Sequence, residues 1–179
     1  MVMVEKKVPI PEGVEVSFDG SSVVVRGPKG EVRKTLEYPG IAIKKGNGEI
    51  VIETKDPKKR QLAILGTYES HIKNMIKGVK EGFEYKMKVI YSHFPMSVKV
   101  EQNGITIENY LGEKVPRKTR IVGNCEVKVK GTEITITGNN IEEVGQTAAN
   151  MEQRTRVKNR DCRVFQDGIY LVEKDGAEI

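Results

Sequence analysis

The sequence contains no tryptophan, only two cysteines and only two histidines, and aromatic residues make up 6% of its 179 positions. Cys125 and Cys162 lie far apart and form no CxxC pair, which predicts two reduced thiols rather than a disulfide. Neither His71 nor His93 has a ligand spacing with a cysteine or with the other histidine, so zinc is not expected. We predict no metal site and no cofactor.

Long hydrophobic runs are missing as well. No apolar stretch is long enough to span a bilayer, and the first residues lack the apolar region of a signal peptide, so we expect a cytosolic protein. A catalytic role for His93 would need both a nucleophile and an orienting acid, and the sequence does not supply both, so we do not expect an enzyme. Hydrophobic residues amount to 37%, enough for a core in one domain or in two small ones.

Positive charge is present in one concentrated segment. The formal net charge is +5, and residues 83–179 are nearly neutral, with 15 Lys and Arg against 14 Asp and Glu. Residues 153–163 nevertheless hold five of these cations and a single acid, Asp161. The five cations are Arg154, Arg156, Lys158, Arg160 and Arg163. Such a segment is suited to a phosphate backbone, and a merely solvated basic loop is the alternative.

The residues from Arg163 to Val172 read as two short strands joined through Asp167-Gly168, a dipeptide typical of type I′ hairpins. We therefore expect the five cations to lead into a rigid hairpin. Lys174 follows it and is a predicted sixth phosphate contact. Phe165 and Tyr170 lie on the predicted strands, where they either pack in the core or stack on an unpaired base.

The first half of the chain reads as short antiparallel strands followed by one helix. Alternating apolar residues and glycine-containing turns predict strands within residues 14–36 and 41–52. Asp56-Pro57 predicts an N-cap followed by a proline at the first helical position. The helix then continues to near Gly82, with an apolar stripe at spacings of three and four, made of Leu62, Leu65, Tyr68, Ile72, Met75, Ile76 and Val79.

The second half repeats the first at an offset of about 84 residues. Residues 14–16 match residues 98–100, and residues 49–52 match residues 133–136. Gly20 matches Gly104, which belongs to the hairpin signal Asn103-Gly104.

A second helix follows from the same register. Asp56 matches Asn140, the expected N-cap, and Glu143 is expected to complete a capping box. Ile141, Val144, Ala148 and Met151 supply its apolar stripe. We predict an α+β fold of two tandem homologous domains that arose by internal duplication, residues 1–82 and 83–179, each an antiparallel sheet packed with one helix. The basic segment has no counterpart in the first copy, so we place the principal site there.

Residues 153–174 resemble the signature of the universal large-subunit ribosomal protein L-six family, in its archaeal and eukaryotic form. The family pattern is Gln, an aliphatic residue, two basic positions and Phe-x-Asp-Gly-aliphatic-aromatic-aliphatic before a final basic residue. The residues at this spacing are Gln153, Val157, Arg160, Arg163, Phe165, Asp167, Gly168, Ile169, Tyr170, Leu171 and Lys174. Residues 27–30, 74–83, 91–93 and 144–150 are similar to other blocks of the family, and only the loop 90–95 departs in detail from its bacterial members.

The resemblance implies a structural, non-enzymatic protein of the cytoplasmic large ribosomal subunit with two homologous α+β domains. It implies binding to large-subunit rRNA near the sarcin–ricin loop and the GTPase docking region at the stalk base, beside neighbouring ribosomal proteins. Besides the six cations, Tyr91, Ser92 and His93 are predicted rRNA contacts, with a turn that positions the strand at Met96 as the alternative. The rival readings are a small enzyme and a free-standing adaptor that binds RNA or an acidic protein.

Overall fold

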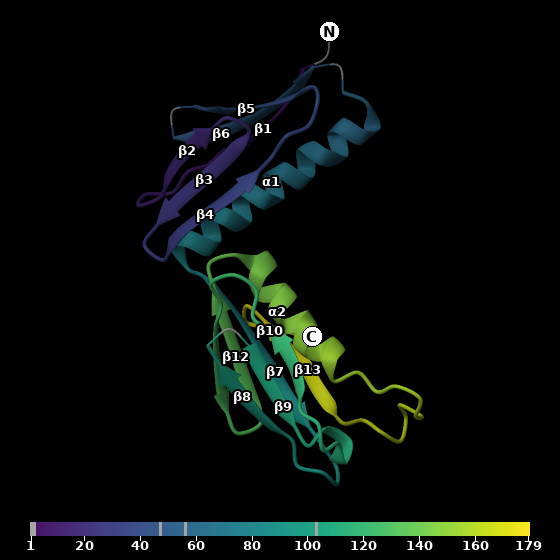
Figure 1. The fold of residues 1–179 in the computed structure, drawn as a ribbon. Coiled ribbons are helices and arrows are strands. Elements are labelled where there is room, and N and C mark those ends of the chain that lie inside the picture. The colour runs from purple at the N-terminus through teal and green to yellow at the C-terminus, as the bar shows by residue number, and fades with distance from the viewer. Residues whose placement is uncertain (1–2, 47, 56, 103) are drawn as a thin grey trace. The chain divides into compact units, whose positions relative to one another are not determined.

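The computed structural model describes residues 3–46, 48–55, 57–102 and 104–179 (Figure 1). The chain folds as two compact units, Met1–Gly82 and Phe83–Ile179. Each unit contains two antiparallel sheets and one long helix. The predicted α+β class with two tandem homologous domains is confirmed, but each unit divides its strands between two sheets instead of one.

The first unit buries its core under helix α1 (Lys59–Lys80). Its first sheet has the order β1-β6-β5, from β1 (Met3–Pro9), β5 (Ile41–Lys45) and β6 (Glu49–Lys55). The second sheet follows chain order, from β2 (Glu15–Asp19), β3 (Ser22–Gly27) and β4 (Gly30–Thr35). Helix α1 contacts strands of both sheets, so its apolar stripe closes a single core.

Helix α1 begins later than the sequence predicts. Lys58 is its N-cap residue and donates its backbone N–H to Oε1 of Gln61 at 2.9 Å. Pro57 therefore precedes the helix rather than taking its first position, and Asp56 lies outside the described residues. The predicted stripe is buried from Leu65 onward, whereas Leu62 in the first turn is 43% exposed.

The second unit is built around the central strand β7 (Phe83–Ile90). Its larger sheet has the order β11-β12-β7-β13-β14, with β11 (Glu126–Lys130), β12 (Glu133–Gly138), β13 (Gly168–Lys174) and β14 (Ala177–Glu178). The smaller sheet has the order β10-β9-β8, with β8 (Ser97–Glu101), β9 (Gly104–Glu108) and β10 (Arg117–Arg120). Helix α2 (Ile141–Arg154) contacts β7, β10, β12 and β13, and the short 3₁₀ turn η1 (Tyr110–Gly112) joins β9 to β10.

The pairings of the two units show the duplication directly. Strand β12 pairs with β7 as β6 pairs with β1, and three-stranded sheets in chain order occur in both units. Among the described residues, strands β13 and β14 have no counterpart in the first unit. There β1 is the end strand of its sheet, whereas the corresponding strand β7 of the second unit also pairs with β13. The added strands are therefore the structural difference between the two copies.

The start of helix α2 agrees with the prediction in part. Asn140 is the N-cap, and its Oδ1 accepts a hydrogen bond from the Glu142 backbone N–H at 3.0 Å. The Glu143 carboxylate instead accepts from Nδ2 of Asn140 and from the Asn124 backbone N–H, so it ties the helix to the loop before β11. The repeat also predicted a hairpin turn at Asn103-Gly104, and Asn103 lies outside the described residues.

The hairpin predicted at Asp167-Gly168 is wrong. Neither residue has the positive φ that a type I′ turn requires, and Asp167 is only 2% exposed. Strand β13 begins at Gly168 and pairs with β7, while residues 163–167 form no strand. The hairpin occurs instead at Asp175-Gly176, with φ of 50° and 84°, and joins β13 to β14, so the acidic C-terminal end is ordered as strand.

Thr155 fixes the path of the chain from α2 to β13. Its buried hydroxyl accepts a hydrogen bond from the Ile169 backbone N–H at 3.0 Å and lies 3.3 Å from the Met151 carbonyl oxygen, to which it donates. Both Thr155 and Ile169 are nearly inaccessible to solvent. The Thr155 hydroxyl therefore connects the two ends of the intervening loop by hydrogen bonds.

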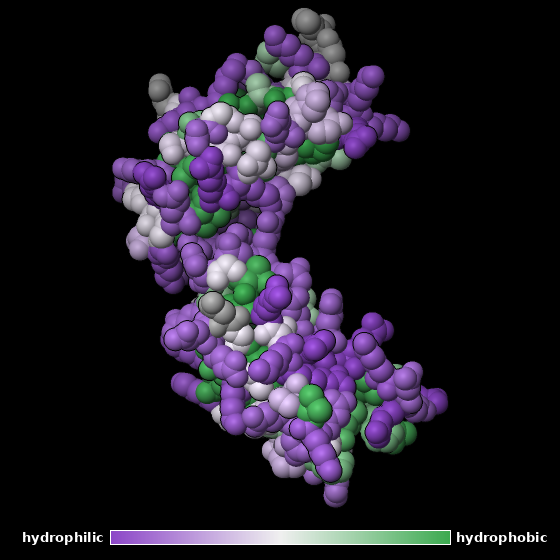
Figure 2. All heavy atoms as spheres, in the orientation of Figure 1, coloured by the Kyte–Doolittle hydropathy of each residue, from purple (hydrophilic) through white to green (hydrophobic). Residues whose placement is uncertain are grey.

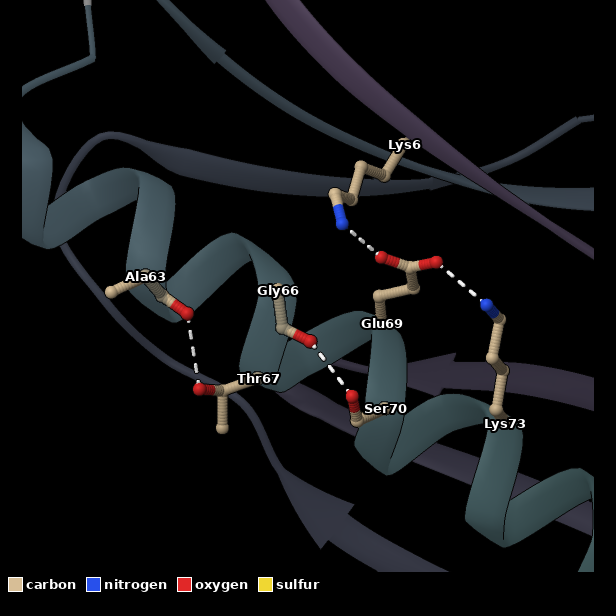
Figure 3. A network of polar contacts seen from close by, with 7 residues as sticks. All are labelled: Lys6, Ala63, Gly66, Thr67, Glu69, Ser70 and Lys73. Atoms are coloured by element: carbon tan, nitrogen blue, oxygen red, sulfur yellow. Dashed lines mark hydrogen bonds and ion pairs between the residues drawn. The ribbon is translucent and has the colours of Figure 1, made fainter.

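A charged network ties the first strand of the first unit to its helix (Figure 3). Lys6 on β1 and Lys73 on α1 both bind the Glu69 carboxylate, while Thr67 and Ser70 donate to carbonyls one turn back. Hydrogen bonds from the two lysines lower the pKa of Glu69 to about 2. Lys6 also points a charge inward on an edge strand, which disfavours pairing with another chain.

We predict that Glu69→Gln destabilises the protein at neutral pH and that this loss shrinks in acid. Because the folded-state pKa of Glu69 lies below its ordinary value, the carboxylate stabilises the fold above about pH 4.5, and the contribution disappears as the pH falls toward 2. Urea unfolding at a series of pH values measures the effect. Glu12→Gln, which changes an exposed carboxylate, is the control, and a pH-independent difference for Glu69→Gln would contradict the assignment.

We also predict that Thr155→Val destabilises the second unit by about 1–3 kcal/mol, because the buried Ile169 N–H loses its acceptor. Thr155→Ser keeps the hydroxyl and should retain most of the stability. Chemical denaturation of both variants tests this, and a larger loss of stability for Thr155→Ser than for Thr155→Val would show that the methyl group, not the hydrogen bond, is what matters.

Candidate RNA-binding surface

The five predicted cations lie together where helix α2 passes into β13. Arg154 is the last residue of α2, and the other four belong to the loop 155–167, which we call the basic loop. All five side chains are exposed. The loop is ordered by its own turns: the Asp161 carbonyl accepts from the Phe165 N–H at 2.9 Å, and Asn159 takes a left-handed φ of 58°.

Two of the five cations interact with an acidic group: Arg163 has Asp161 as its partner, and the charge of Arg160 acts on Glu113, whose pKa is lowered by the hydrogen bonds from Arg117 and further by Arg160. Arg163 is bound by Asp161 at 2.9 Å, and this guanidinium lowers the pKa of the Asp161 carboxyl. Within the part of the chain that the structure describes, no salt bridge to Arg154, Arg156, Lys158 or Arg160 is found. These four side chains are therefore available to an external anion, whereas Arg163 must first give up or share its partner.

The basic loop distributes these cations between two hollows. Arg154 and Lys158 line a cavity of about 210 Å³ together with Arg117. Arg156 and Arg160 line a larger cavity of about 480 Å³. Each hollow thus has a pair of the five predicted cations in its wall.

Arg117, at the start of β10, holds this arrangement in place. Its guanidinium lies 4.1 Å from the centre of the Tyr110 ring and makes two hydrogen bonds to Glu113, at 2.8 and 2.5 Å. Nη1 donates to the Arg154 carbonyl at 2.7 Å, where a cation suits the negative end of the helix dipole. The hydrogen bonds from Arg117 lower the pKa of Glu113, so the pair stays charged.

Our sequence reasoning did not identify Arg117 as part of the site. A signal was present in residues 117–120, Arg-Lys-Thr-Arg, where three of four residues are cations and none is acidic. Lys118 and Arg120 are exposed on β10, and α2 packs against that strand. The positive surface of the second unit is therefore wider than the basic segment alone.

The loop containing Tyr91, Ser92 and His93 lies beside the basic loop. Strand pairing sets Ile90 opposite Gly168, and the Ser92 hydroxyl donates to Oδ1 of Asp167 at 3.2 Å. Ser92 thus braces the buried Asp167, while Tyr91 is 40% exposed and His93 is exposed with its ring packed edge-on against Phe94. All three predicted contacts are exposed, and Ser92 has a structural partner as well.

Lys174 does not join this surface. It lies at the other end of β13 from the basic loop, six residues from Gly168, which is about 20 Å along a strand. It is exposed and sits opposite Ala177 in the C-terminal hairpin. Its predicted RNA contact would have to be separate from those of the basic loop.

The described residues contain no group of three or more His, Cys, Asp or Glu side chains that could hold a metal ion. The same residues include no helix long and apolar enough to cross a membrane. Both Cys125 and Cys162 are free, and Cys162 is exposed on the basic loop.

Comparison with known proteins identifies the family. The family described as Ribosomal protein L6 matches the chain twice, over residues 10–82 and 94–168. The protein named Large ribosomal subunit protein uL6 from Methanosarcina mazei is 52% identical over 171 residues, covering 96% of this chain and 97% of its own length. Those of Methanococcus vannielii and Methanobrevibacter smithii are 51% and 50% identical, with 96% or more of both chains covered. The chain belongs to the ribosomal protein L6 family.

Proposed function

We propose that this protein is a structural constituent of the large ribosomal subunit and that it binds large-subunit rRNA through the loop end of its second unit. Family membership supports the first statement and makes the protein a non-enzymatic part of the cytoplasmic ribosome, with rRNA and neighbouring ribosomal proteins as partners. The observation that carries the second is a set of four cations that are exposed at the end of α2 and on the basic loop, without salt bridges in the described structure: Arg154, Arg156, Lys158 and Arg160.

The chemistry of these side chains suits phosphate. Three of the four are arginines, whose planar guanidinium can donate to two phosphate oxygens at once. The loop is held at both ends, by Thr155 and by Arg117, so ordering it on binding costs little conformational entropy. A rigid cationic surface of this kind reads the shape of an RNA helix rather than its sequence.

In this proposal the protein braces RNA helices near the sarcin–ricin loop, at the stalk base where translation GTPases dock. Its role there is to neutralise phosphates so that the factor-binding region keeps its geometry. Tyr91, His93 and Arg163 form the margin of the same surface, Ser92 supports it through Asp167, and Lys174 would be a separate contact. The duplicated fold supplies two stable units, of which the second carries the added strands and the basic loop.

We predict that replacing Arg154, Arg156, Lys158 and Arg160 by Ala weakens binding to a large-subunit rRNA fragment that carries the sarcin–ricin region. Each phosphate contact contributes about 0.7–0.9 to the slope of log K against log salt, so the slope should become shallower by about 3–4. Binding is measured by filter binding across a salt series, with thermal unfolding to show that the variant is folded.

A matched control removes four positive charges elsewhere. Lys29, Lys55, Lys58 and Lys59 are exposed in the first unit, and their replacement by Ala changes the net charge equally. This control should keep most of the wild-type slope. If both variants lose affinity alike, the basic loop is not the anchor, and if wild-type protein binds an acidic protein in preference to rRNA, the adaptor interpretation replaces ours.

A further inference from the structure

The larger of the two hollows has features that a phosphate-binding surface does not need. Its volume of about 480 Å³ falls in the range of small-molecule sites. Its wall includes the side chains of Val157, Phe165 and Tyr170, while Arg156 and Arg160 also line it. Where the basic loop lies in Figure 1, Figure 2 shows hydrophobic atoms among hydrophilic ones.

The Tyr170 ring is held in a fixed position at this cavity. Its hydroxyl donates to the Gln166 carbonyl at 3.1 Å. The ring also lies directly over Gly168, where an added Cβ would come within 3.1 Å of three of its atoms. A Cβ at residue 168 would therefore require the ring to move by a few tenths of an ångström. Burial raises the pKa of Tyr170, so the phenol stays neutral at physiological pH.

The basic loop supplies positive charge at this cavity. The Arg160 guanidinium lies 4.8 Å from the centre of the Phe165 ring, and Arg156 is exposed beside it on the loop. Arg160 thus covers the Phe165 ring, and Tyr170 is the other aromatic side chain that lines the cavity. An aromatic face with adjacent guanidinium groups is the combination on which nucleic-acid bases stack while their phosphates are bound.

We propose that this cavity takes a single unpaired nucleotide of the bound RNA, with its base against Tyr170 and its phosphate at Arg156 and Arg160. The inference rests on the proposed rRNA binding and adds a specific ligand to that surface. Gln153, which also lines the cavity, offers an amide donor and acceptor to a base edge. Unpaired nucleotides with splayed bases are the elements of RNA that proteins recognise individually.

The test compares Tyr170→Leu with Tyr170→Phe on the same rRNA fragment. Loss of the ring should weaken binding by about 5- to 100-fold, the range that base–aromatic stacking contributes, without changing the salt slope. Tyr170→Phe keeps the ring and should bind nearly as well as wild type. Tyr38→Leu is the matched control, because Tyr38 is a half-exposed tyrosine in the first unit that also lies near an arginine, Arg60.

Acylation of RNA 2′-hydroxyls locates the nucleotide. Wild type and Tyr170→Phe should protect one unpaired nucleotide that Tyr170→Leu leaves reactive. If Tyr170→Leu proves unfolded by its thermal transition, Tyr170→Met, which also removes the ring but keeps a long apolar side chain, takes its place. Equal affinities and identical footprints for all folded variants would overturn the proposal.

Two further results separate the possible failures. If wild-type protein binds the fragment with the expected salt slope but the ring variants behave as wild type, the nucleotide site fails while the rRNA-binding function stands. If wild type does not bind the fragment at all, the proposed function itself fails.

Saturable micromolar binding of AMP, GMP, CMP or UMP that the rRNA fragment does not displace would assign the cavity to free nucleotides and overturn its role in RNA binding.

Discussion

The pairing of β13 with β7 is the constraint on which the rest of the second unit depends. The two strands are separated by most of that unit in sequence, yet their register sets Gly168 opposite Ile90. This one pairing brings the basic loop beside the loop 91–95 and closes it against helix α2. Among the described residues of the first unit, β1 is the end strand of its sheet, so no strand equivalent to β13 places a loop there.

Three contacts then keep the surface in one conformation. Thr155 joins the end of α2 to β13, Ser92 joins Asp167 to the neighbouring loop, and Arg117 joins the last carbonyl of α2 to Tyr110 and Glu113. In the proposed function the cations are presented before RNA arrives, so little binding energy is consumed in ordering them. The Tyr170 ring is likewise held in place, by its hydrogen bond to the Gln166 carbonyl.

The sequence predicted the repeat, the two helices and the basic segment, because periodicity, capping residues and charge are local properties. The prediction of the hairpin was wrong because two turn signals in the sequence are equivalent. Asp167-Gly168 and Asp175-Gly176 are the same dipeptide, and only the long-range pairing of β13 with β7 decides that the second one turns. The sequence did not indicate a role for Arg117, because that role depends on its contacts with Tyr110 and with Arg154, and Arg154 lies 37 residues further along the chain. Asp56-Pro57 predicted a start of α1 that is too early, because the N-cap is Lys58, whose backbone N–H donates to the Gln61 side chain.

Hydrogen–deuterium exchange of the intact protein, with and without the rRNA fragment, tests the central claim most directly. The account predicts that RNA slows exchange in peptides covering the basic loop, residues 155–167, and the adjoining residues 91–95. Exchange at the C-terminal hairpin around Asp175-Gly176 should change little, because it lies at the far end of β13. Protection confined to the first unit, or to residues 175–179, would contradict the placement of the RNA-binding surface.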